Sequence, residues 1–190
     1  EGRLALFLIL ARIAHAGSRL SAVRWAEQHA VSDLLGLEDF DENDLYAALD
    51  WLEVEQTRIE ERLYEAYVKD HGEPPAIVLY DVTSSYFEGE HNELADYGYN
   101  RDGKKGKKQI VIGLLTGADG EPLAVRVFEG NTADPSTVST QIGLLKQQFG
   151  VEEVVFIGDR GMLKAKGKAA LGVAGWRYIS ALTKPQVRAL

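Results

Sequence analysis

Hydrophobic residues recur at two different spacings along the chain, and the spacing changes near residue 75. Residues 3–70 repeat apolar side chains at helical intervals of three and four, whereas the chain from residue 76 holds short apolar runs rich in β-branched residues. Helical intervals predict helices that pack along one face, and short β-branched runs predict buried strands. We therefore expect a helical segment followed by a sheet-containing domain.

The first apolar run, residues 4–10, allows two interpretations. Arg3 before the run and Ala14-His15-Ala16 after it resemble a secretory signal with its cleavage site. Arg12 interrupts that pattern, however, and no initiating Met is present. Four apolar residues also share one helical face, namely Leu4, Phe7, Leu8 and Ala11. We favour an internal amphipathic helix, and no segment is long enough to span a bilayer.

Two further helices are expected before residue 72. One runs from Ser18 or Ser21, either of which is a suitable helix cap, to about Ala30. The other is long and begins near Asp41, whose acidic neighbours favour a helix N-terminus. Its apolar stripe consists of Leu45, Leu49, Leu52, Ile59, Leu63 and Ala66. The spacing resembles that of a coiled coil, but such a stripe is more often an ordinary packing face.

The sequence His-Gly-Glu-Pro-Pro at 71–75 ends the long helix. This breaker predicts two domains, an acidic helical segment over 1–72 and a second domain over 76–190. In the second, strands are predicted at 76–83, 108–116, 122–129, 153–158 and 176–181, and helices at 134–149 and 162–172.

The predicted order in the second domain is β-β-β-α-β-α-β. Three strands form an antiparallel meander, with a tight turn at 117–120, and a helix then crosses to a parallel strand. This order describes an α/β fold with a ribonuclease-H-like mixed sheet. In that topology the first and fourth strands lie side by side at the centre.

The apolar run of each of these two neighbouring strands leads into an aspartate, Asp81 in one and Asp159 in the other. A carboxylate beside a buried strand is costly unless a partner neutralises it. Two adjacent carboxylates also repel each other unless cations lie between them. The pattern therefore predicts a divalent-metal site, and paired metals about 3.5–4 Å apart support in-line phosphoryl transfer.

Composition narrows the choice of metal. The chain has no cysteine and four scattered histidines, which excludes thiolate sites and disfavours a zinc cluster. Oxygen ligands remain, and they favour Mg²⁺ or Mn²⁺. The absence of cysteine is also compatible with a cytoplasmic protein.

The net charge of −8 belongs to the first part of the chain. Residues 1–70 hold 15 acidic and 7 basic residues, whereas residues 71–190 hold 14 of each. Nucleic-acid-binding domains usually carry a basic excess, so the overall charge counts against DNA binding.

Four blocks of the sequence resemble, in the same order, those of bacterial insertion-sequence transposases of the DDE class. They are YDVTSSYFEG at 80–89, YGYNRDGK at 97–104, EGNTAD at 129–134 and IGDRGM at 157–162. The resemblance covers about residues 76–182. It implies a ribonuclease-H-like catalytic domain, dependence on Mg²⁺ or Mn²⁺, and cutting and joining of transposon ends, with Asp81 and Asp159 as the first and second catalytic acids.

The same resemblance implies DNA as partner, both transposon ends and target, with self-association in a synaptic complex in the bacterial cytoplasm. The family's third acid is a glutamate on a later helix, expected well beyond Ile179. Residues 180–190 contain no Asp or Glu. We therefore expect a catalytic domain that is incomplete at its C-terminus and inactive alone.

A basic run between the first two strands is the main candidate for DNA contact, and it contains Arg101, Lys104, Lys105, Lys107 and Lys108. Such a run is either a solvated connection or a phosphate-contacting loop. Arg160 likewise suits a phosphate contact or a structural ion pair. Tyr97 and Tyr99 are expected to pack against the sheet rather than stack on bases, and Asn131 suits a plain turn or the metal centre.

Three functions remain open. The chain is a transposase catalytic fragment, another ribonuclease-H-like nuclease such as a resolvase or RNA–DNA hybrid hydrolase, or a non-catalytic DNA-binding or scaffold remnant of a transposase. Joining of strands by a 3′-hydroxyl belongs only to the first.

Overall fold

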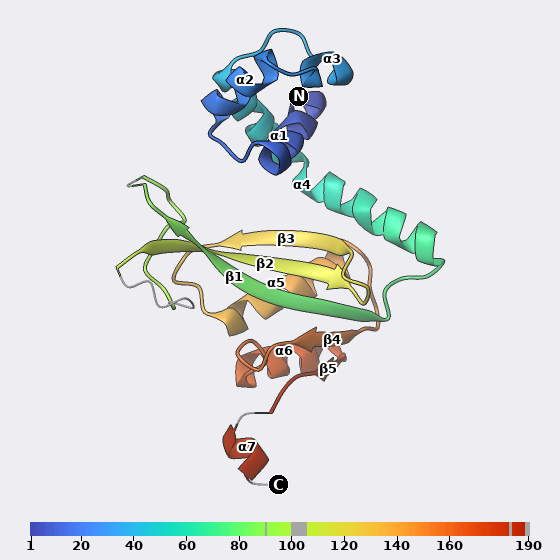
Figure 1. The fold of residues 1–190 in the computed structure, drawn as a ribbon. Helices are drawn as coiled ribbons and strands as arrows, with labels where there is room; N and C mark the ends of the chain where they lie inside the picture. The colour runs from blue at the N-terminus through green and yellow to red at the C-terminus, as the bar shows by residue number, and fades with distance from the viewer. Residues whose placement is uncertain (90, 100–105, 183, 189–190) are drawn as a thin grey trace. The chain divides into compact units, whose positions relative to one another are not determined.

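The computed structural model describes residues 1–89, 91–99, 106–182 and 184–188. The chain divides into two compact units, Glu1–Ile59 and Glu60–Leu190, and the long helix α4 (Glu42–His71) contributes to both (Figure 1).

The first unit is helical, as predicted. It contains α1 (Gly2–Ala14), α2 (Arg19–Glu27), α3 (Val31–Leu35) and the first part of α4. The Ser18 side chain caps α2 by accepting a hydrogen bond from the Ser21 backbone N–H at 3.1 Å. The core is formed by Phe7, Ala11, Ala22, Ala26 and Leu45.

α3 was not predicted, because five residues are too few to show a helical period. Within the described residues, no single helix is long and apolar enough to cross a membrane. α1 and α2 meet that test only as a pair, and the chain bends by 92° between them.

Asp41 and Asp44 cap the start of α4 reciprocally. The Asp41 carboxylate accepts hydrogen bonds from the backbone N–H groups of Asn43 and Asp44, and Asp44 accepts one from the backbone N–H of Asp41 at 2.8 Å. The bonds from Asp44 and Asn43 lower the pKa of Asp41. This cap explains why the acidic residues of the sequence mark the helix start.

The second unit contains a five-stranded mixed sheet with the order β3-β2-β1-β4-β5 (Figure 1). The strands are β1 (Ile77–Phe87), β2 (Lys108–Gly117), β3 (Pro122–Phe128), β4 (Val155–Gly158) and β5 (Arg177–Ile179). The helices are α5 (Asp134–Gln147), α6 (Ala165–Ala174) and α7 (Lys184–Arg188). The predicted order is confirmed, including the central position of β1 beside β4; α7 was not predicted.

The register of the central strands decides which side chains are buried. β1 pairs antiparallel with β2 from Val78↔Gly117 to Phe87↔Lys108, and parallel with β4 from Ile77↔Val155 to Tyr80↔Gly158. Side chains alternate along a strand, so one set faces the core. That core includes Val78, Tyr80, Val111, Leu115 and Phe156 together with Leu145 of α5 and Leu171 of α6.

The other face of the sheet keeps apolar side chains partly open to solvent. Leu114, Val125, Val127 and Ile179 are exposed, and β-register places the first three on neighbouring strands of that face. The sheet therefore buries one face against α5 and α6 and leaves the opposite face more accessible.

The last part of α4 packs on the sheet unit through a face that the apolar stripe did not predict. Glu60 and Tyr67 are buried and the Tyr64 ring stacks on Phe149 at 4.4 Å, whereas Leu63 and Ala66 are exposed. The expected stripe is therefore wrong at those two positions, because this helix end docks through the Glu60 carboxylate on β3 and through the Tyr64 ring on Phe149, which follows α5.

Glu60 makes the polar part of that contact. Its carboxylate accepts a hydrogen bond from the Val125 backbone N–H at 3.1 Å and an ion-paired hydrogen bond from Arg126.

The two compact units divide at Ile59, inside α4, whereas the sequence suggested domain limits of 1–72 and 76–190. Those domain limits stay a prediction.

Replacing Glu60 with alanine removes the carboxylate partner of Arg126 and the acceptor for the Val125 N–H. Breaking a buried ion pair from one side costs about 3–5 kcal/mol of unfolding free energy. We expect that loss for Glu60→Ala in urea denaturation, a smaller one for Glu60→Gln, and almost none for the exposed control Glu61→Ala. An unchanged stability of Glu60→Ala would contradict this docking contact.

Candidate functional site

Asp81 and Asp159 lie next to each other where β4 ends beside the middle of the longer strand β1. The last parallel pair between β1 and β4 is Tyr80↔Gly158, and each aspartate is the next residue of its chain segment. Both are exposed, and both line one open hollow of about 470 Å³ together with Leu79, Leu114, Thr116 and Ile157. The structure therefore brings the two predicted acids together.

Burial of the flanking residues directs Asp81 to the accessible face of the sheet. Tyr80 and Val82 are buried in the core, so the alternation of side chains turns Asp81 the opposite way. Its carboxylate accepts a hydrogen bond from the Val82 backbone N–H at 2.8 Å. Asp81 is thus held by its own strand.

Asp159 begins the turn from β4 toward α6. Its backbone carbonyl accepts hydrogen bonds from the N–H groups of Met162 at 3.1 Å and Leu163 at 3.0 Å. Both of those residues are buried. The turn is therefore anchored in the core while the Asp159 side chain stays accessible.

A third carboxylate, Asp134, lies beside Asp159. A methyl group built on Gly161 would be 3.3 Å from Asp159 Oδ2 and 3.8 Å from Asp134 Oδ2, so the two carboxylates flank this glycine. From the sequence, Asp134 was predicted only to begin a helix. The predicted strand order could have placed Asp134 near the other two acids, because β3 runs parallel to β1 and the helix after β3 therefore begins on the same side of the sheet.

Cationic side chains share that region. A hollow of about 610 Å³ is lined by Asp134 and Asp159 and also by Arg160, Lys164 and Tyr99. Of the predicted DNA-contacting residues, Arg160 is therefore beside the acids. Its role as a phosphate contact stays a prediction.

The basic run is only partly described. Arg101, Lys104 and Lys105 lie outside the described residues. Lys107 Nζ donates a hydrogen bond to Glu88 Oε1 at 2.9 Å, and Lys108 is the first residue of β2. Lys107 therefore forms a surface ion pair, of the kind that contributes little stability.

Gln109 anchors the segment that precedes the basic run. Its side-chain Nε2 is buried and donates hydrogen bonds to the backbone carbonyls of Gly130 at 2.9 Å and Tyr99 at 3.2 Å. Its backbone also forms two hydrogen bonds with Asp96. A side chain at Gly98 or Gly130 would collide with neighbouring backbone, so the close approach needs both glycines.

This anchoring bears on two expectations from the sequence, the burial of Tyr97 and Tyr99 and the role of Asn131. Tyr97 and Tyr99 are 61% and 76% exposed, so the expected burial is wrong: the segment is held by its backbone and not by its rings. Asn131 donates a hydrogen bond from Nδ2 to Asp96 Oδ2 at 2.7 Å, which engages it in the same loop contact.

Tyr80 adds no negative charge to the site. Burial raises the pKa of its phenol, and the nearby Asp134 and Asp81 raise it further. The negative charge at this end of the sheet therefore comes from the carboxylates.

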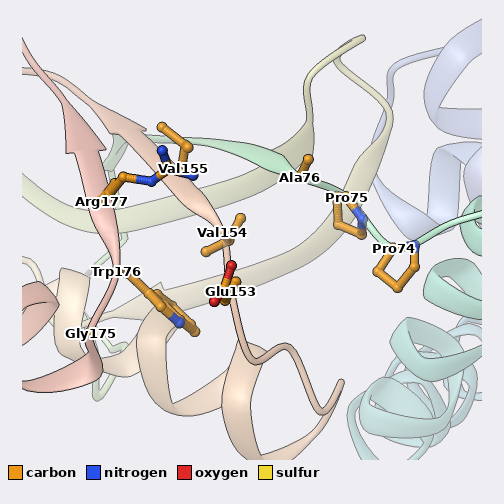
Figure 2. Close-up of a pocket in the computed structure, with 9 residues that line it drawn as sticks. All are labelled: Pro74, Pro75, Ala76, Glu153, Val154, Val155, Gly175, Trp176 and Arg177. Atoms are coloured by element: carbon orange, nitrogen blue, oxygen red, sulfur yellow. The ribbon is translucent and has the colours of Figure 1, made fainter.

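A third hollow, of about 530 Å³, lies where β1, β4 and β5 begin (Figure 2). It is lined by residues at the start of β1, β4 and β5, among them Pro75, Glu153 and Arg177. Trp176 in its wall donates a hydrogen bond from Nε1 to the Glu152 carbonyl at 2.7 Å. Glu153 is the carboxylate in its lining. A single carboxylate is a weaker metal site than a pair, so we take the hollow with Asp81 and Asp159 as the candidate site.

The family model for the transposase DDE domain matches residues 72–188. The chain belongs to this family. The resemblance to transposases of the DDE class that was expected from the sequence is thereby confirmed. No curated protein matches the chain.

Solved structures of Mos1 transposase are similar to the chain at low sequence identity. A Mos1 paired-end complex with the left transposon end matches with a TM-score of 0.39 and 11% identity, over 97% of this chain and 60% of that chain. The catalytic domain of Mos1 mariner transposase matches with a TM-score of 0.35 and 14% identity, over 69% and 63%. The chain thus spans about three fifths of the length of these solved chains. Its membership of the transposase DDE domain family rests on the family model and not on these structures.

Replacing Gln109 with leucine removes the two side-chain hydrogen bonds that hold Tyr99 and Gly130. Leaving a buried acceptor without its donor costs about 1–3 kcal/mol. We expect Gln109→Leu to lose that much stability and to speed hydrogen exchange in residues 94–99, with no such change in the exposed control Gln147→Leu. Unaltered exchange in that segment would rule out the anchoring role.

Proposed function

We propose that this chain is the part of a DNA transposase that carries the first two catalytic acids, Asp81 and Asp159. The single observation that carries the proposal is the membership of the transposase DDE domain family, in which the match includes both residues. The parallel register of β1 and β4 supports it, because it places two acids that are distant in sequence beside each other at the end of β4.

The donor set suits a hard divalent cation. Asp81 and Asp159 offer exposed carboxylate oxygens, which Mg²⁺ and Mn²⁺ prefer. Asp134 offers a further carboxylate next to Asp159. When bound, such ions lower the pKa of a coordinated water or hydroxyl group and neutralise charge on a phosphodiester. The protein's own contribution is to hold the carboxylates in place through the buried neighbours of each aspartate.

DNA is the proposed partner, as transposon end and as target. Arg160 and Lys164 line the hollow beside the acids, where phosphate oxygens pair well with cations. Tyr99 in the same lining is exposed and offers a ring on which a base can stack. Arg101, Lys104, Lys105, Lys107 and Lys108 would extend this contact, and a synaptic assembly of several copies would add to it.

The residues after Ile179 contribute no acid. We therefore propose that the 190 residues bind the metal but do not cleave DNA alone, and that cleavage and strand joining need the family's third acid.

Magnesium binding is the first test. We expect Mg²⁺ to raise the unfolding temperature of the 190-residue chain, because the ion stabilises the state that binds it. Asp81→Asn and Asp159→Asn should each abolish that rise, whereas the exposed control Asp50→Asn should retain it. Equal Mg²⁺ stabilisation in all four proteins would reject the site assignment.

The second test is an assay of DNA cleavage and strand joining. It compares the 190-residue chain with a natural form of the protein that includes the family's third acid. We expect Mn²⁺- or Mg²⁺-dependent strand joining by a 3′-hydroxyl, lost in Asp81→Ala and Asp159→Ala. Unchanged activity in either variant sinks the proposal. Hydrolysis without joining, or of RNA–DNA hybrids, favours another ribonuclease-H-like nuclease. Salt-sensitive DNA binding without metal stabilisation favours a non-catalytic remnant.

A further inference from the structure

A second group of possible metal ligands lies at the junction of α4 and the β2–β3 turn. His71 is the last residue of α4, and Asp119 and Glu121 flank Gly120 in the turn. One ligand atom from each of the three residues lies within 4.8 Å of the other two. All three belong to the unit Glu60–Leu190, so their arrangement does not depend on the helical unit.

The His71 ring is held in one orientation from two sides. Its plane stacks on the Tyr67 ring, with centroids 4.0 Å apart and an angle of 15°. Nδ1 lies 2.9 Å from the Tyr67 backbone carbonyl. A carbonyl only accepts, so Nδ1 is the donor. Histidines that bind metals commonly donate their other ring N–H to such a carbonyl, which fixes the tautomer.

That orientation aims Nε2 at a carboxylate. Nε2 lies 2.8 Å from Asp119 Oδ2, and Asp119 Oδ1 accepts the Glu121 backbone N–H at 3.2 Å. With the ring proton on Nδ1, two lone pairs face each other across 2.8 Å. A cation must lie between them, either an additional proton on Nε2 or a metal ion.

The spacing already approaches that of a metal site. Two ligands of a tetrahedral ion, each bonded at about 2.0–2.1 Å, lie about 3.3 Å apart. His71 Nε2 and Asp119 Oδ2 therefore need to separate by only roughly 0.5 Å to admit one. One imidazole nitrogen with two carboxylates suits Zn²⁺, Co²⁺ or Ni²⁺ better than Mg²⁺.

We propose that His71, Asp119 and Glu121 bind a first-row transition-metal dication, with Zn²⁺ as the representative ion. The ion joins the end of α4 to the β2–β3 turn. The site is separate from the two catalytic aspartates: the turn follows Gly117, which pairs with Val78, whereas Asp81 pairs with Leu114, three positions further along β1. The proposal stands whether or not the chain is a transposase.

The test titrates Zn²⁺ and Co²⁺ into the 190-residue chain carrying Asp81→Asn and Asp159→Asn, which removes the hard-ion site. We expect one Zn²⁺ per chain by calorimetry at pH 8, visible ligand-field absorption with Co²⁺, and a higher unfolding temperature. Two variants in this background remove ligands, His71→Gln and Glu121→Gln. His91→Gln changes an exposed histidine elsewhere and serves as the matched control.

Glu121→Gln is the decisive variant, because it keeps the His71–Asp119 contact and the fold. Loss of a residue that only supports a metal ligand typically weakens binding about 10- to 100-fold, so loss of the ligand Glu121 should weaken Zn²⁺ binding at least about 10-fold. His71→Gln should abolish the Co²⁺ absorption. His91→Gln should bind as the background protein does. Absence of Zn²⁺ binding, or binding that is the same in Glu121→Gln and His91→Gln, overturns the proposal.

Discussion

The parallel pairing of β1 with β4 is the constraint on which the candidate site depends. Only four residue pairs join the two strands, from Ile77↔Val155 to Tyr80↔Gly158. Phe156 is fully buried opposite Val78, and burial of such a side chain contributes about 1.5–3 kcal/mol. A slip of one residue would turn Phe156 to the accessible face, so core packing also fixes Asp159 beside Asp81.

A second constraint fixes the surroundings of the acids. Gln109 uses its backbone to bind Asp96 and its side chain to bind the carbonyls of Tyr99 and Gly130. One residue at the start of β2 therefore ties together the loop after β1 and the segment after β3. Through these contacts Tyr99 reaches the hollow that Asp134, Asp159 and Arg160 line.

The sequence predicts best what depends on local periodicity. Apolar runs and turn residues sufficed for the strand order, and the order sufficed to make Asp81 and Asp159 neighbours. Contacts between distant segments were not predictable in this way. The carboxylate of Glu60 on the β3 edge, the exposed ring of Tyr99 and the proximity of Asp134 to Asp159 each depend on how whole elements dock.

The histidines illustrate the same limit. Their sequence spacing gave no ligand pattern, because His71 meets Asp119 and Glu121 only after the β2–β3 hairpin has formed and the end of α4 has packed beside it. The antiparallel register and the turn at Gly120 create that proximity. Residues that are far apart along the chain thus become one cluster through tertiary structure alone.

The two borders of the sheet have a consequence for solubility. Free backbone N–H and C=O groups on a border strand invite pairing with another molecule. On β3, one such N–H, that of Val125, is already occupied by the Glu60 carboxylate. β5 is only three residues long and begins with the charged Arg177. Both border strands therefore offer a poorer template for strand addition than a long edge strand with all its N–H and C=O groups free.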